Sequence, residues 1–437
     1  MGGVLLVAND TALVFSDTLC RGLSLADIPV GGLSVGEAEK IVTQALTKRQ
    51  AEPVLTLQYG EKKWDVPWDI VRNRPDAASL VRRAYGVGRT GNLLERIESQ
   101  FVSTNGGKTI PLGLEPDMEK LRLFISDIAS NLERKPVDAI LTDTHSNLHI
   151  EPDVTGLRVD IEATLLKTAQ AITTGRAYPV SVVASEKPAA VQVADLKGID
   201  GLLSSFATTF DLNDEDRSHN IKIAAEKLNG TLVKGGAILS FNDRIGTRVP
   251  EAGYRMAPTM SSTGMVMDWG GGVCQVSTTL YNAALLSDFQ VIERSAHYEP
   301  PAYVPLGLDA TVADGQIDLK LKNNSANPIY IKSSVEAGKL DVRIYGKRDA
   351  QIAAVKIETA EKSLRVPQTL IVQDHSLPFG QEIVDSEGKP AFQVMVQRIK
   401  LRGNIELSRE TISTDEFEGA DRIVRVGTLK ESGQTGK

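Results

Sequence analysis

The run Gly270-Gly-Gly-Val-Cys-Gln-Val-Ser-Thr-Thr-Leu-Tyr-Asn-Ala283 decides how the middle of this 437-residue chain folds. Its glycines permit a tight turn, and the residues after them predict a helix that extends to about Ser287. At about 100° per residue, apolar side chains gather on one face and predict a core-facing stripe of Val273, Val276, Leu280, Ala283 and Ala284. Polar side chains gather on another face and predict a second stripe of Cys274, Ser277, Thr278 and Tyr281.

The position of Cys274 suggests a nucleophile. It stands in the first turn of the predicted helix, where partial positive charge and unpaired N–H groups favour a thiolate over a thiol. A nucleophilic cysteine needs a base and an orienting group, and His297 and Asp309 follow it in the order Cys, His, Asp. His219 is a competing base. We therefore predict catalytic roles for Cys274, His297 and Asp309.

Two other interpretations of the same residues remain open. In the first, Cys274 is a small packing residue beneath the glycine turn, His297 caps a strand or bonds a carbonyl, and Asp309 forms an Asx-turn. In the second, these residues line a ligand-binding cleft without catalysis.

Further residues around the glycine run are predicted to contact a substrate: Gly270, Gly271, Gly272, Gln275, Ser277, Tyr281 and Arg294. The glycines allow close approach of a substrate and supply backbone donors. One cysteine and one plausible histidine fall short of a zinc site, so we expect no metal and no cofactor.

Composition narrows the class of protein. The length predicts two or three domains. The net charge is −7 and the sequence has no long basic stretches, so nucleic acid is not an expected partner. Cys20 and Cys274 lie in different predicted domains, so a disulfide is not expected. Residues 1–21 include the apolar stretch Gly3–Ala8 and are either a simple lead or the remnant of a truncated membrane anchor.

The pattern of elements predicts a multidomain α+β protein with a β-rich C-terminal module. Residues 22–195 are predicted to form an α+β domain with a degenerate internal repeat, which includes a helix whose capping box is Ser34 and Glu37. Residues 203–345 form a middle domain, in which Gly253 to Pro258 is expected to be turn and loop. Residues 355–428 alternate like strands, and 429–437 are expected to be disordered.

The middle domain resembles the VanW family of bacterial cell-surface proteins. The residues that carry the resemblance are Ser240-Phe-Asn242, Gly246-Thr-Arg248, Gly253-Tyr254, Ala257-Pro258, Gly270 to Ala284, Glu293-Arg294, His297, Tyr303 to Gly307, Asp309 to Val312 and Asp318. Tyr298 departs from the family pattern, in which a serine is expected.

The flanking domains resemble known modules too. Residues 22–195 are similar to the peptidoglycan-binding domain that commonly precedes VanW domains, at Ile28 to Leu33, Ala84 to Arg89, Pro136 to Ala139 and Gly156 to Asp160. The last domain resembles the glycine-five domain through Gly380, Gly388, Gly403 and Gly427, although Ala391 stands where a glycine is expected.

These resemblances imply an extracellular protein that faces the cell wall, anchored to the membrane in its full-length form. They imply peptidoglycan or its precursors as partner, and an accessory role in cell-wall maintenance or in the response to glycopeptides such as vancomycin. The alternative is a cysteine-dependent peptidoglycan peptidase, amidase or transpeptidase that uses Cys274 and His297. The oligomeric state is not predicted.

Overall fold

The computed structural model describes residues 13–144, 147–175, 179–261, 264–349 and 354–429. The chain forms two compact units: the first comprises Met1–Val137 and Val154–Ala190, and the second comprises Asp138–Asp153 and Val191–Lys437. Of the predicted lead or anchor segment 1–21, residues 1–12 lie outside the described residues. Of the predicted disordered tail 429–437, only Leu429 is described, and it is the last residue of strand β25 (Arg422–Leu429) rather than part of a disordered tail. Among the described residues, no helix combines the length and the hydropathy that crossing a bilayer requires.

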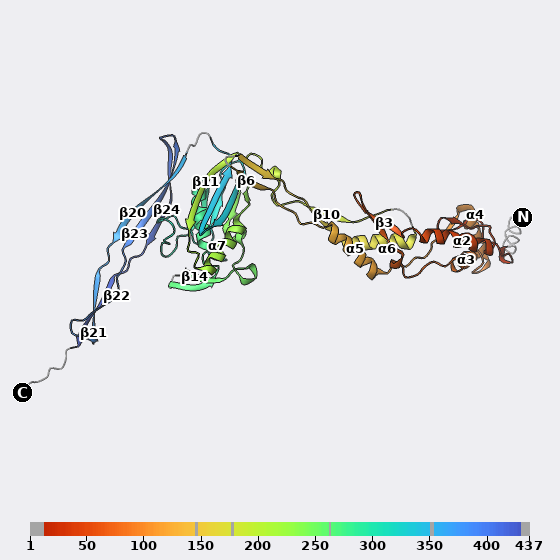
Figure 1. The fold of residues 1–437 in the computed structure, drawn as a ribbon, viewed down its shortest axis with the longest axis horizontal. Coiled ribbons are helices and arrows are strands. Elements are labelled where there is room, and N and C mark those ends of the chain that lie inside the picture. Colours follow the sequence, from red (N-terminus) through yellow and green to blue (C-terminus); the bar gives the residue numbers. More distant parts are fainter. Residues whose placement is uncertain (1–12, 145–146, 176–178, 262–263, 350–353, 430–437) are drawn as a thin grey trace, which may run out of the picture. The chain divides into compact units, whose positions relative to one another are not determined.

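Helices alternate with short sheets in the first unit (Figure 1). The sheets have the strand orders β2-β1-β5, β4-β3-β9 and β10-β8, and apolar side chains from strands and helices share one core. The elements are β1 (Leu23–Leu25), β2 (Ile28–Pro29), α2 (Val35–Gln50), β3 (Leu55–Tyr59), β4 (Lys62–Val66), η1 (Trp68–Ile70), α3 (Ala77–Tyr85), α4 (Leu93–Gly106), β5 (Lys108–Ile110), α5 (Met118–Leu132), β8 (Gly156–Val159), α6 (Ile161–Thr174), β9 (Val180–Ser181) and β10 (Ala184–Lys187).

The start of α2 confirms the predicted capping box. The Ser34 hydroxyl accepts a hydrogen bond from the Glu37 backbone N–H at 3.3 Å, and the Glu37 carboxylate accepts one from the Ser34 N–H at 3.0 Å. This exchange satisfies backbone donors that the helix itself leaves unpaired. The sequence pattern therefore determines this helix boundary locally.

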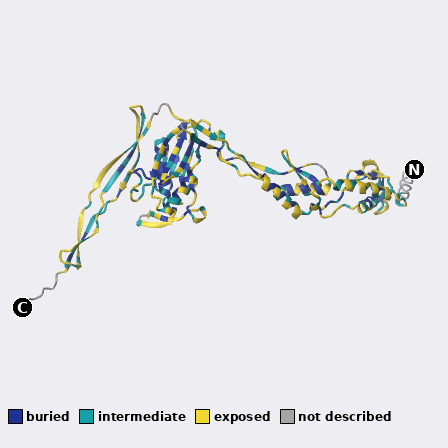
Figure 2. Cartoon of the chain, in the orientation of Figure 1, coloured by how far each residue is buried: buried dark blue, intermediate teal, exposed yellow. Residues whose placement is uncertain are grey.

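The second unit is built around the antiparallel sheet β11-β19-β18-β12, against which α7 and α9 pack, and buried residues concentrate in this region (Figure 2). A smaller sheet has the order β13-β17-β16. The elements are β6 (Ile140–Thr144), β7 (Asn147–Glu151), η2 (Val193–Leu196), β11 (Gly201–Thr209), α7 (Glu215–Leu228), β12 (Thr231–Val233), β13 (Ile238–Ser240), α8 (Phe241–Ile245), η3 (Pro250–Ala252), β14 (Met256–Ser261), β15 (Gly264–Trp269), α9 (Val273–Leu286), β16 (Gln290–Glu293), β17 (Lys320–Lys322), β18 (Ile329–Glu336) and β19 (Lys339–Gly346).

The hairpin β6–β7 belongs to the second unit although the sequence suggested a place in the first domain. Its side chain Leu141 is buried in a small apolar cluster with Leu196 and Tyr330, and the Tyr345 hydroxyl donates to Asp143 at 3.2 Å. The stretch predicted as one domain over residues 22–195 is therefore divided between the units, and so is the second half of the predicted repeat.

The end of the second unit is a β-rich module, which confirms the predicted fold class. Its strands form the sheets β20-β23-β24 and β21-β25-β22, and most of their side chains are exposed (Figures 1 and 2). The strands are β20 (Ala354–Arg365), β21 (Thr369–Pro378), β22 (Glu382–Ser386), β23 (Ala391–Arg402), β24 (Ile405–Phe417) and β25 (Arg422–Leu429).

The loop prediction for Gly253 to Pro258 is wrong in its second half. Strand β14 begins at Met256 and pairs antiparallel with β15 in the register Met256↔Trp269. Pro258 lies within this strand, although proline is normally confined to edge strands or bulges. Both strands of a two-stranded hairpin are edge strands, so Pro258 is accommodated without interrupting the pairing with β15.

Candidate active site

The glycine run is a tight turn that joins β15 to α9. Gly270 and Gly272 have φ values of +80° and +104°, which favour glycine, and Gly272 is the N-cap of α9. Gly271 is required for a different reason: a Cβ atom on it would lie 2.5 Å from the carbonyl oxygen of Ala257 in β14. The glycine turn therefore packs directly against the backbone of strand β14.

We expect Gly271→Ala to lower the stability of the second unit by about 2 to 3 kcal/mol, because backbone atoms rather than a flexible side chain must move. The matched control is Gly315→Ala, where φ is +67° but the added methyl meets nothing within 4 Å. That control costs only the left-handed strain of about 1 kcal/mol. Urea unfolding measures both variants, and equal midpoints would contradict a close approach at Gly271.

Cys274 lies in the first turn of α9 and is partly exposed. Its Sγ is 3.7 Å from the Thr311 hydroxyl and 3.5 Å from the Val312 carbonyl oxygen. Burial acts to raise the pKa of the thiol, but the hydrogen bond and positive charge of His297 outweigh it and lower that pKa to about 7. The positive end of the helix dipole acts in the same direction.

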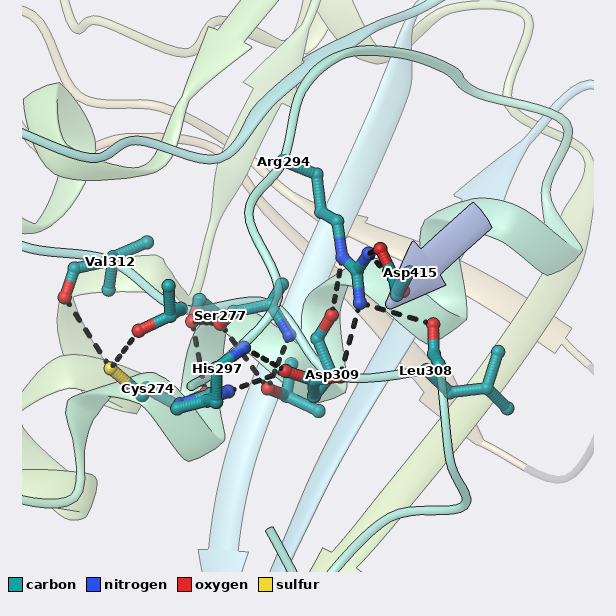
Figure 3. A network of polar contacts seen from close by, with 12 residues as sticks. Cys274, Ser277, Arg294, His297, Leu308, Asp309, Val312 and Asp415 are labelled. Carbon is teal, nitrogen blue, oxygen red and sulfur yellow. Dashed lines mark hydrogen bonds and ion pairs between the residues drawn. The ribbon is translucent and has the colours of Figure 1, made fainter. Parts of the chain in front are cut away.

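His297 lies between Cys274 and Asp309 (Figure 3). The His297 backbone N–H and its Nδ1 each lie 2.6 Å from the same oxygen of Asp309, which holds the ring in one orientation. Burial acts to lower the pKa of His297, whereas the hydrogen bonds to Asp309 and Cys274 raise it to about 9. The two residues titrate as a pair, and the directions favour thiolate with imidazolium near neutral pH.

Asp309 is only 1% exposed and stays ionised. Burial acts to raise its pKa, but the hydrogen bond from His297 and the charge of Arg294 lower it below the ordinary value. The competing base His219 lies elsewhere, with its Nε2 3.0 Å from the Gly253 carbonyl oxygen. Within the described ranges, no group of three or more His, Cys, Asp or Glu side chains could hold a metal ion.

A thiol, an imidazole and a carboxylate therefore meet near the start of one helix. This arrangement has the chemical parts that covalent acyl transfer requires.

Family models match all three parts of the chain. "VanW like protein" matches residues 216–345, "Putative peptidoglycan binding domain" matches residues 66–181, and "G5 domain" matches residues 355–429. Residues 216–345 therefore belong to the VanW family. We refer to residues 216–345 as the VanW domain and to residues 355–429 as the G5 domain. Together with the peptidoglycan-binding match, these domains mark a protein associated with the cell wall.

Curated relatives agree with this membership. "Uncharacterized protein YoaR" of Bacillus subtilis is 29% identical over 276 residues, which cover 60% of this chain and 86% of that protein. "Vancomycin B-type resistance protein VanW" of Enterococcus faecalis is 30% identical over 158 residues, which cover 35% of this chain and 58% of that protein. The chain thus spans less than two thirds of the resistance protein. The solved structure "IgA1 Protease G5 domain structure" is 34% identical over 17% of this chain and 89% of its own, with a TM-score of 0.16.

The polar stripe of α9 does not face a groove, contrary to the sequence-based expectation. Every residue from Val273 to Leu285 except Cys274 is buried. The stripe instead holds the segment that carries Asp309: the Ser277 hydroxyl donates to the Ala310 carbonyl at 2.6 Å, and the Thr278 hydroxyl accepts from the Ala310 N–H at 3.0 Å. Asn282 donates to the Leu308 carbonyl at 2.7 Å. Helical periodicity separated the faces correctly but could not tell which segment covers the polar one.

Most predicted substrate contacts are consequently corrected. Ser277 and Tyr281 are fully buried, and the side-chain amide of Gln275 bonds the Thr208 hydroxyl and the Arg217 guanidinium at 2.9 and 2.8 Å. Gly270 and Gly271 are buried beneath Arg248 and β14. Because these residues are buried, they support the site from within the fold and are not exposed to contact a substrate.

Arg294 is also buried, and it supports Asp309. Its side chain is 4% exposed, its Nε donates to the Asp309 carbonyl at 2.7 Å, and its Nη2 lies 3.1 Å from the Asp309 carboxylate. Its Nη1 lies 2.6 Å from both carboxylate oxygens of Asp415 in β24 (Figure 3).

Sequence reasoning missed Thr311, Val312 and Asp415 as neighbours of the site. Thr311 and Val312 lie in the segment that matches the VanW family, and this resemblance could have indicated that they lie near the site. Asp415 carried none, because it lies 121 residues from Arg294 in a different domain.

Proposed function

We propose that this protein is a cysteine-dependent enzyme that cuts or exchanges amide bonds in the peptide part of peptidoglycan. The observation that supports the proposal best is the assembly of Cys274, His297 and Asp309, in which the pKa of the Cys274 thiol is lowered to about 7. A structural cysteine has no need of an oriented, protonated imidazole beside it.

In the first step the Cys274 thiolate attacks the carbonyl carbon of a peptide amide. The electron pair of the carbonyl moves to oxygen, and the positive end of the α9 dipole stabilises the negative charge that develops there. The tetrahedral intermediate then collapses as the imidazolium of His297 gives its proton to the leaving amine. The products of this step are a thioester on Cys274, neutral His297 and a free amine.

In the second step the thioester is resolved. Neutral His297 takes a proton from water, and the resulting hydroxide attacks the thioester carbonyl and releases a carboxylic acid and the thiolate. If the amine of a second stem peptide enters in place of water, the same step yields a new amide, and the enzyme is a transpeptidase. Asp309 keeps Nδ1 of His297 protonated, so that the other ring nitrogen faces the thiol.

The substrate class rests on the flanking domain. A domain that matches a peptidoglycan-binding family over residues 66–181 brings the chain to the wall, where peptide amides are abundant. This supports peptidoglycan, or its precursors, as the partner of the first unit, on the outer side of the bacterial membrane. An accessory role in cell-wall maintenance or in the glycopeptide response is supported by the name of the Enterococcus faecalis relative.

The second candidate is a wall-binding accessory protein without catalysis. The observation that favours it is the burial of Gln275, Ser277 and Tyr281, which leaves fewer polar side chains to contact a substrate than the sequence suggested. Under this interpretation the thiol is activated but has no wall substrate.

Incubation of the full chain with purified sacculi separates these candidates. We expect the unaltered protein to release peptides or new amino groups, and Cys274→Ala to release neither, because no other nucleophile attacks the carbonyl. Both proteins should sediment with the sacculi, since the change lies outside the first unit. Sedimentation without any cleavage or exchange by the unaltered protein would support the accessory role instead, and absence of sedimentation would contradict binding to the wall.

A further inference from the structure

The G5 domain contributes a charged side chain to the neighbourhood of the candidate site. Asp415 in β24 is 13% exposed and forms a short, two-oxygen contact with Arg294, whose side chain is 4% exposed. Arg294 contacts Asp309, and Asp309 contacts His297. A continuous buried chain of alternating charges thus leads from β24 to the imidazole (Figure 3).

Arg294 divides its donors between the two domains. Its Nε and Nη2 bond the Asp309 carbonyl, the Gly307 carbonyl and the Asp309 carboxylate at 2.7, 3.2 and 3.1 Å. Its remaining nitrogen, Nη1, donates to the carboxylate of Asp415. A buried guanidinium must be paired, because its charge is costly to remove from water. Without Asp415, the whole charge of Arg294 would act on Asp309.

Packing keeps this contact in place. Gly307 has a φ of +80°, and a Cβ atom on it would lie 2.8 Å from side-chain carbons of Val394 and Val396 in β23. Both valines are buried, so β23 lies directly against the segment that leads to Asp309. The position of this segment therefore depends on the G5 domain as well as on α9.

We propose that Asp415 is a positioning residue for the Cys274 site: it holds Arg294 so that the Asp309 carboxylate remains available to orient and charge His297. The G5 domain in this view completes the site of the VanW domain. The link to catalysis rests on the proposed function, whereas the effect on His297 does not.

The other titratable groups around the network are the phenols of Tyr281 and Tyr303. The Arg294 guanidinium lies 5.5 Å from the centre of the Tyr281 ring. Burial raises the pKa of Tyr281 to about 12 and raises the pKa of Tyr303 as well, so both phenols are neutral near neutral pH. Changes in the protonation of His297 therefore report on Asp309, Cys274 and the Arg294 contacts.

Nuclear magnetic resonance titration of ¹⁵N-labelled histidine in the full chain tests the proposal. The His297 signals are assigned by their loss in His297→Ala. In Asp415→Asn we expect the His297 titration midpoint to fall by roughly one unit, because Arg294 then draws the Asp309 charge away from the imidazole. Asp415→Glu, which retains the carboxylate, should restore at least half of this shift.

The matched control is Glu410→Gln on the same strand, β24. Glu410 pairs with Arg398 at 2.8 Å, and the Arg398 side chain, 4% exposed, donates to the Phe289 carbonyl at 2.6 Å, but the pair does not touch Asp309. A shift in Asp415→Asn and none in Glu410→Gln supports the proposal. Equal shifts, or none in either, would overturn it and leave Asp415 as an ordinary packing contact.

Thermal melting checks that both variants are folded. If Asp415→Asn is not, Arg294→Lys, which keeps the charge but loses the planar fork, replaces it and should lower the same midpoint. Failure of the unaltered chain to cut sacculi would contradict the proposed function but leave the His297 shift intact. A chain that cuts sacculi but shows no shift in Asp415→Asn would contradict only the positioning role.

Discussion

His297→Ala will move the midpoint of the Cys274 alkylation profile from about 7 to 9 or above. Removal of the imidazole leaves burial, which raises the thiol pKa, without the hydrogen bond and positive charge that lower it. The thiolate then forms only at alkaline pH. We expect this to be one of the two largest effects. The contacts with His297 make the main contribution that lowers the pKa of the Cys274 thiol, against the effect of burial.

Alkylation rates measured over a pH series that brackets both midpoints test this prediction in a Cys20→Ala background. Cys20 is the other cysteine of the chain and is buried, so its removal assigns all labelling to Cys274. The midpoint is more informative than the rate, because a thiolate of higher pKa is also intrinsically more reactive. His219→Ala is the control, since His219 contacts Gly253 instead. A profile unchanged in His297→Ala would remove the basis for an activated thiol.

If the chain cuts sacculi as proposed, Asp309→Asn will lower the rate of that cleavage by about a thousandfold, although Cys274 and His297 are both retained. The change preserves shape but removes the charge that pairs with the imidazolium and with Arg294. The pKa of His297 should therefore fall from about 9 towards or below its ordinary value, and the ring loses the carboxylate that fixes its orientation.

Asp314→Asn is the matched control, because Asp314 is a nearby carboxylate that pairs with Arg248 instead of Arg294. The rate of amine release from sacculi and the His297 titration are measured in both variants. A rate in Asp309→Asn within about threefold of that in Asp314→Asn would show that Asp309 has no catalytic part, since loss of an orienting carboxylate costs far more.

The pH dependence of folding stability provides an independent test of His297 and Asp309. The pKa of His297 is raised from 6.5 to about 9, so its contribution to stability is fully present below the ordinary value and is lost as the pH rises through about 9. The pKa of Asp309 is lowered, so its contribution is present above the ordinary value and is lost on acidification.

Local features of the candidate site could be predicted from the sequence. The glycine turn, the helix after it and the position of Cys274 in its first turn follow from residue types and short-range periodicity. The structure brings His297 and Asp309 together as the order Cys, His, Asp suggested. These predictions depended on a few residues whose chemistry is distinctive.

The sequence was less informative where burial decides the role. Ser277 was predicted to contact a substrate because a polar stripe on a helix is usually exposed. In the structure the segment around Ala310 covers that stripe, and strand β11 bonds the amide of Gln275, another predicted substrate contact. Periodicity gives the direction of a side chain around its helix but not the identity of what packs against it.

By itself, the sequence determined the α+β composition, the start of α9 and the candidate thiol, imidazole and carboxylate, because each depends on residue types and short-range patterns. Only the tertiary structure decided that the polar stripe of α9 is buried except at Cys274, that the hairpin β6–β7 belongs to the second unit and that Asp415 contacts Arg294. The physical reason is range. Capping and helical periodicity act over a few residues, whereas burial and charge pairing depend on segments that only the fold brings within a few ångströms.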